Sequence, residues 1–154
     1  MRKYARMLYI DMKYLCVDFG TKKCGLAQSD DFGSVAMPLA IVATRELDFE
    51  ISKLFAKNVY AKIVFGESRD SMGNENAVFA KAKEVAEKIY KKYKIEIVFE
   101  KEFFSSKHAR ADDGKRDVDD RAAALILQRY LDKENIKNKS NEQRQEQADF
   151  EDNM

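Results

Sequence analysis

One run near the beginning of the chain, residues 14–27, most constrains the fold. It reads Tyr-Leu-Cys-Val-Asp-Phe-Gly-Thr-Lys-Lys-Cys-Gly-Leu-Ala, an apolar strand that delivers one carboxylate into a turn and continues as a second strand. Gly20 can adopt the positive φ that a tight reversal needs. Asp18 is therefore expected at a strand end, in a concave place suited to metal-dependent phosphate chemistry. The simpler alternative is that Asp18 only hydrogen-bonds the turn amides.

The order of apolar segments predicts a single α/β domain over residues 14–132. Three strands at about 14–19, 24–29 and 35–41 are joined by short turns, which favours an antiparallel meander. Helices expected at 46–58, 74–93 and 119–131 then alternate with strands at 61–66 and 95–102. This order predicts a mixed sheet, with the meander joined to parallel strands and helices on both faces.

The two ends of the chain differ from this domain in composition. Residues 1–13 are expected to form an N-terminal extension. Residues 133–154 lack apolar periodicity and are rich in Asn, Gln, Glu and Lys, so we expect a disordered polar tail. No stretch approaches the ~18 apolar residues of a membrane span, and no apolar run with a cleavage-type site follows the start. A cytoplasmic protein with two reduced cysteines is the expectation.

The charge balance is compatible with a nucleic-acid enzyme but does not demand one. The whole chain has 28 Lys and Arg against 27 Asp and Glu, a net charge of +1. From residue 133 onward four basic residues stand against six acidic ones, which leaves 24 against 21, or +3, for residues 1–132. A modestly basic body therefore precedes an acidic tail.

Three acidic residues fall where this architecture would bring side chains to one edge of the sheet. Asp18 ends the first strand, Glu102 ends the last strand, and Asp119 opens the final helix on its apolar stripe. Each has a simpler individual interpretation, as a turn residue, a solvated strand end or a helix N-terminus. Together they predict a site for Mg²⁺ or Mn²⁺, because oxygen ligands suit these ions and buried carboxylates need cations. Two such ions would support phosphodiester cleavage.

Other side chains around this edge are candidates for binding substrate phosphates or for replacing one of the three acids. Residues that could hold substrate phosphates are Thr21, Lys22, Arg110, Lys115 and Arg116. Basic loop residues are more often only solvated. Glu100, two residues before Glu102 on the same strand face, is the alternative acid on that strand, and Asp120 is the alternative to Asp119.

Several of these segments together resemble the YqgF/RuvX family. Residues 17–27, Val-Asp-Phe-Gly-Thr-Lys-Lys-Cys-Gly-Leu-Ala, look like its first motif, and residues 118–131, Val-Asp-Asp-Arg-Ala-Ala-Ala-Leu-Ile-Leu-Gln-Arg-Tyr-Leu, look like its last. Residues 63–66 and 72–76 are similar to its glycine-bearing loop and helix start. Residues 102–109 match its Asp-Glu-Arg-Leu-Thr-Thr segment in spacing, so the resemblance spans residues 14–132.

The resemblance implies an RNase H-like fold and a nuclease. The family's metal-binding and catalytic acids fall on Asp18, Glu102 and Asp119. Its members are described as pre-16S rRNA nucleases and Holliday junction resolvases, so the implied substrate is the 5′ end of 16S ribosomal RNA or, alternatively, branched DNA. The chain is expected to be a monomer or a homodimer, and branched DNA would normally require the dimer, with two sites facing two strands. Lys101 and Phe103 replace the Asp and Arg that flank the family's glutamate, which removes a phosphate-binding guanidinium.

Two rival functions come from other classes of protein. An Asp-x-Gly-Thr hairpin also describes the phosphate loop of actin-like and sugar-kinase-like nucleotide binders, but those proteins need two such domains and a much longer chain. A non-catalytic nucleic-acid or ribosome-assembly factor would keep the fold and lack cleavage. Loss of cleavage on Asp18→Asn would separate the nuclease from this second rival.

Overall fold

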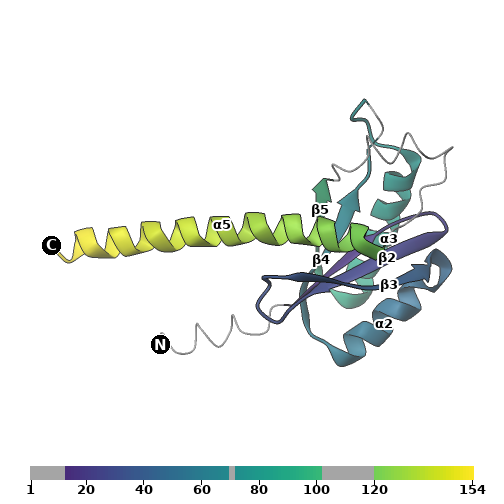
Figure 1. The fold of residues 1–154 in the computed structure, drawn as a ribbon, viewed down its shortest axis with the longest axis horizontal. Helices are drawn as coiled ribbons and strands as arrows, with labels where there is room; N and C mark the ends of the chain where they lie inside the picture. Colours follow the sequence, from purple (N-terminus) through teal and green to yellow (C-terminus); the bar gives the residue numbers. More distant parts are fainter. Residues whose placement is uncertain (1–12, 70–71, 102–119) are drawn as a thin grey trace.

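The computed structural model describes residues 13–69, 72–101 and 120–154 (Figure 1). The predicted N-terminal extension lies outside this part of the chain except for Lys13, which already belongs to the first strand. The elements are β1 (Lys13–Asp18), β2 (Lys23–Ser29), β3 (Ala36–Ala43), the 3-10 helix η1 (Thr44–Glu46), α2 (Leu47–Lys57), β4 (Tyr60–Glu67), α3 (Ala77–Tyr93), β5 (Glu96–Lys101) and α5 (Asp120–Asp152).

The strands form one mixed sheet in the order β3-β2-β1-β4-β5. β2 pairs antiparallel with both β1 and β3, whereas β4 pairs parallel with both β1 and β5. The predicted meander joined to parallel strands is therefore confirmed, and the α/β fold is consistent with an RNase H-like domain.

The side chains of β1 alternate between two apolar clusters, one on each face of the sheet. Leu15 and Val17 pack into the cluster formed with α2 and α3. Cys16 packs into the second cluster, whose helical members come from α5, with Leu127 fully buried among them. Helices thus cover both faces, as predicted, and a two-residue period in the strands assigns each position to one face (Figure 1).

The two cysteines are free thiols buried in different clusters. Cys16 lies on the α5 face, and Cys24 lies on the face covered by α2 and α3. Their side chains therefore point to opposite sides of the sheet. The expectation of reduced packing residues is confirmed.

The turn between β1 and β2 reverses the chain without a positive φ at Gly20. Among the described glycines, the positive φ values occur at Gly33, in the turn between β2 and β3, and at Gly73. The carbonyl of Gly20 instead accepts a hydrogen bond from Thr44 Oγ1 at 2.7 Å. The expectation for Gly20 was wrong because a four-residue connection to β2 spreads the reversal over several residues.

The C-terminal segment differs from the predicted disordered tail, because α5 continues as one helix to Asp152 (Figure 1). Its first part is nucleated by packing on the sheet, and extending a formed helix avoids the cost of nucleation. Lys, Glu and Gln are good helix formers, and side-chain pairs such as Gln145 with Asp149, at 3.1 Å, add support. Absence of an apolar stripe therefore indicated solvent exposure rather than disorder.

The helices that the structure describes include none with the length and apolar character that crossing a membrane requires. α5 is long enough, but its mean composition is strongly polar.

Unfolding is expected to become easier at alkaline pH because of two buried acids of high pKa. Burial raises the pKa of Tyr60 from 10 to about 12 and raises that of the Cys24 thiol above 9. Their contribution to stability is complete below the unfolded pKa values and is lost as pH rises through the folded ones. Urea midpoints should therefore fall between about pH 9 and pH 12.

Tyr60→Phe tests this pH dependence. The Tyr60 hydroxyl donates a hydrogen bond to Gln28 Oε1 at 2.6 Å, so the variant should be less stable near neutral pH and show a weaker alkaline decline. The exposed Tyr90 provides the control, since Tyr90→Phe should leave the profile unchanged. An identical decline in wild type and Tyr60→Phe would contradict the assignment.

Candidate active site

Asp18 is the last residue of β1 and its side chain is almost completely buried, with 2% of its surface exposed. It follows Cys16 by two positions, and Cys16 belongs to the cluster covered by α5. Because side chains alternate along a strand, the carboxylate of Asp18 also points to the α5 face. An acid therefore lies at the carboxyl end of a central strand, below a helix.

The positions beside Asp18 in the sheet are glycines. Gly25 of β2 is its direct partner in register. In β4, Gly66 follows Phe65, the register partner of Val17, and so lies level with Asp18. Neither neighbour adds a side chain next to the carboxylate. The local sequence thus places a buried oxygen donor between two glycines of the neighbouring strands.

The turn after Asp18 carries Thr21 and Lys22, both exposed as expected. The start of η1 holds this turn in place, because the backbone N–H of Thr44 donates to the carbonyl of Lys22 at 2.9 Å. Thr44 Oγ1 makes the second link, to Gly20. Thr21 and Lys22 are therefore presented to solvent on an anchored loop next to Asp18, which is compatible with phosphate contact.

The thiol of Cys24 lies close to this turn but is not a nucleophile candidate. Burial is the largest cause that raises its pKa, a hydrogen bond with Thr44 Oγ1 at 3.4 Å opposes the rise, and the charge of Asp18 adds to it. A thiol with a raised pKa stays protonated at neutral pH and reacts poorly. The chemistry of the site is thereby left to oxygen groups.

Helix α5 runs from the carboxyl end of β1 back toward its beginning. The ring of Tyr130 packs against that of Tyr14, with centroids 5.8 Å apart. Asp120 precedes Tyr130 by ten residues, about 15 Å of helix, and Asp18 follows Tyr14 by four residues, about 13 Å of strand. The beginning of α5, with the exposed Asp120, is therefore about level with Asp18.

Glu100 is a buried acid on the same face of the sheet, but it is already neutralised. It pairs in register with Gly66, so two strand spacings of about 4.8 Å separate it from the level of Asp18. Its carboxylate forms an ion pair with Lys133 and lies 3.9 Å from the guanidinium nitrogen Nε of Arg129. Two cations from α5 make Glu100 an unsuitable substitute for Glu102 as a metal ligand.

Five of the predicted site residues lie outside the described part of the chain. These are Glu102, Arg110, Lys115, Arg116 and Asp119. Among the residues that are described, no three His, Cys, Asp or Glu side chains come together as a metal site would require. Asp18 fits such a site by its oxygen donors, its burial and the glycine beside it in β2. Its two expected partners stay predictions.

A further cation at this edge escaped the sequence argument. Arg69 follows β4, its Nη1 donates to the carbonyl of Gly73 at 2.8 Å, and it forms an ion pair with Glu67. Asn76 then caps α3 by accepting a hydrogen bond from the N–H of Phe79 at 2.8 Å. In the sequence, Arg69 belongs to a charged run after a strand. Such a run does not show whether the arginine holds the loop by hydrogen bonds or is only solvated.

Comparison with known proteins places this arrangement among nucleases. The family model described as "RuvX: Holliday junction resolvase" matches residues 12–133. A protein of Caldicellulosiruptor bescii named "Putative pre-16S rRNA nuclease" is 33% identical over 133 residues, which cover 79% of this chain and 96% of that protein. A protein of Sulfurihydrogenibium with the same name is 33% identical over 138 residues, covering 83% and 95%. The similarity thus includes β1 with Asp18 and the first part of α5.

Proposed function

Because the chain belongs to the RuvX family of Holliday junction resolvases, we propose that it is a divalent-metal-dependent endonuclease acting on structured nucleic acid in the cytoplasm. The names of the family and of the relatives support a nuclease role. The substrate that we propose is precursor 16S ribosomal RNA, processed at its 5′ end, because the relatives are named for it.

The placement of Asp18 is the observation that carries this proposal. Its carboxylate is buried at a strand end, has Gly25 as its register partner, and lies about level with the beginning of α5. Burying a carboxylate is costly unless a cation or hydrogen bonds compensate it. A divalent cation held by Asp18, and by the acids that follow β5 and precede α5 in the sequence, would be a compensation that also has a chemical use.

The residues that we propose as metal ligands are Asp18, Glu102 and Asp119. The ions, when bound, activate water and stabilise the leaving oxygen of the phosphodiester. Asp18 is fixed in position because β1 pairs with a strand on each side, β2 and β4. Thr21 and Lys22 orient the substrate backbone from the anchored turn, because an exposed ammonium and hydroxyl suit phosphate oxygens.

Cleavage assays with two substrates test the proposal. The full chain is incubated with precursor 16S ribosomal RNA and, separately, with a four-way DNA junction, each with Mg²⁺, with Mn²⁺ and with excess EDTA. We expect cleavage of the RNA near its mature 5′ end, supported by either ion and abolished by EDTA. Cleavage that persists in EDTA would contradict the role of a metal.

The family description specifically favours one second candidate, cleavage of branched DNA. Cleavage of the junction alone would reverse our ranking of substrates, and a homodimer would then be expected, with one site for each of two strands. Specific binding of the RNA without any cleavage would instead indicate the non-catalytic assembly factor.

A further inference from the structure

The second half of α5 projects from the domain as a lone helix (Figure 1). Leu131 is its last buried residue, and Asn135 makes a contact with the body by donating a hydrogen bond to the carbonyl of Gly33 at 3.3 Å. All residues from 136 to 154 are exposed. The family match ends at residue 133, so this projecting helix is an addition to the matched region.

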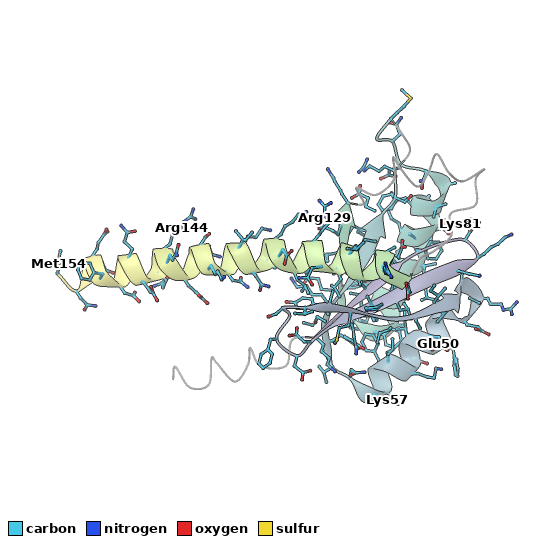
Figure 2. All side chains as sticks on the ribbon, viewed as in Figure 1. Glu50, Lys57, Lys81, Arg129, Arg144 and Met154 are labelled. Carbon is cyan, nitrogen blue, oxygen red and sulfur yellow. The ribbon has the colours of Figure 1, made fainter. Side chains whose placement is uncertain are left out.

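The charges on α5 are divided between two faces. Steps of three and four residues place Arg129, Lys133, Lys137 and Arg144 on one face, with the neutral Ser140 and Gln147 between and beyond them. Figure 2 shows Arg129 and Arg144 on the same side of the helix. The opposite side carries acidic residues, namely Glu142, Glu146 and Asp149. The net charge of −2 from residue 133 onward thus conceals a basic face, defined as Arg129, Lys133, Lys137 and Arg144.

This basic face begins beside Glu100, two strand spacings of about 4.8 Å from the level of Asp18. Arg129 and Lys133 both meet Glu100 at the carboxyl end of β5. Glu102, the proposed catalytic acid, follows Glu100 by two positions. Lys137 and Arg144 continue the same face outward, and both are exposed. Lys137 forms an ion pair with Glu134 at 3.3 Å, which a bound phosphate would have to displace.

We propose that the basic face of α5 binds the phosphate backbone of a nucleic-acid duplex that extends outward from the active site. This inference rests on the proposed nuclease function and adds the path of the substrate. From Arg129 to Arg144 the face is about 22 Å long, roughly two thirds of a duplex turn of 34 Å. Lysine and arginine contacts to phosphates fix the register of a duplex without reading bases.

A second copy of the chain is a poorer occupant of this helix. Ile136 and Phe150 are large apolar residues of the projecting part, and both are exposed. A coiled-coil seam needs apolar residues at two positions in every heptad, whereas Ser140, Gln143 and Gln147 occupy the positions between them. The charges therefore favour a polyanion. Glu151 lies on the same face as Arg144, one turn beyond Gln147. We therefore expect the contact with the polyanion to end before Glu151.

Binding without divalent ions tests the inference separately from cleavage. The full-length double variant Lys137→Gln/Arg144→Gln is compared with wild type on a long RNA duplex and on a four-way DNA junction, across a series of salt concentrations in EDTA. We expect affinity to fall at least about tenfold, and the slope of log affinity against log salt to become shallower by about 1.8 on DNA, which is two contacts of about 0.9 each. Of the RNA duplex and the DNA junction, the one whose affinity falls more in the double variant is the nucleic acid that the basic face binds.

A matched control is available on the other side of the helix. Lys139→Gln removes the same charge two residues from Lys137, but outside the basic face, and should change affinity much less than Lys137→Gln. Equal losses for the two single variants would overturn the inference. So would unchanged duplex binding by the double variant with loss of self-association in sedimentation, which would assign the helix to a second copy.

These outcomes separate this inference from the proposed nuclease function. A double variant that binds duplex as tightly as wild type, in a protein that still cleaves its substrate, overturns only the role of the basic face. Failure of cleavage with Mg²⁺ overturns the nuclease proposal, while the binding comparison in EDTA is measured independently of it. Circular dichroism of the variants confirms that the helix itself is retained.

Discussion

Asp18→Asn is expected to reduce cleavage at least about a thousandfold while the protein stays folded. Asn has almost the same shape as Asp but carries no charge, so it fits the buried position and binds a divalent cation weakly. A thousandfold loss corresponds to about 4 kcal/mol of transition-state stabilisation, a magnitude that loss of a metal ligand can explain. The measurement is single-turnover cleavage of precursor 16S ribosomal RNA with saturating Mg²⁺, alongside a thermal melt.

Asp31→Asn is the matched control for this substitution. Asp31 is an exposed acid at the opposite end of β1, where it lies 3.5 Å from Lys13. Its replacement should leave the cleavage rate within about twofold, because an exposed ion pair far from the site contributes little. Cleavage at the wild-type rate by Asp18→Asn, with the fold intact, would refute the proposed site.

Leu127→Ala is expected to destabilise the domain by about 2 to 5 kcal/mol, the usual cost of a cavity at a fully buried leucine. Leu127 packs with Cys16, Ala27 and Val64, so it anchors α5 on the sheet. A loss of this size is a large part of the roughly 5 to 15 kcal/mol that stabilises an ordinary domain. The measurement is the urea midpoint and slope at neutral pH.

Leu125→Ala provides the same chemical change two residues earlier on the same helix. Leu125 is 47% exposed, so its truncation should change the free energy of unfolding by about 0.5 kcal/mol or less. Similar effects for Leu125→Ala and Leu127→Ala would show that α5 does not pack on the sheet by the face described above.

Local sequence was sufficient to predict β1 and the position of Asp18 at its end. The apolar run that stops at Asp18 is a strand signal that needs no distant partner, and the observed strand ends at that residue. The periodicity of residues 74–93 likewise predicted α3, which begins at Ala77 and whose buried positions include Ala82, Ala86 and Ile89. Strand pairing followed from connection lengths, because short turns favour antiparallel neighbours and helical crossovers favour parallel ones.

The C-terminal helix shows where local patterns fail. Residues 133–154 have no apolar stripe, and a free peptide of this composition would be marginally helical at best. Their helicity follows from the packed turns before them, in which Ile126, Leu127 and Leu131 are buried. Residues 133–154 do not fold independently of the turns before them, because helix formation is cooperative along the chain.

By its own sequence, this protein determined its strands, its helices up to residue 131 and the strand end that holds Asp18, because these depend on neighbours within a few positions. Only the tertiary structure decided that α5 crosses the sheet with its beginning near Asp18, that Arg129 and Lys133 neutralise Glu100, and that a basic face leads outward from there. The physical reason is that an ion pair between β5 and α5 depends on the crossing angle of a helix over a twisted sheet. Packing of both elements sets that angle, which no local pattern encodes.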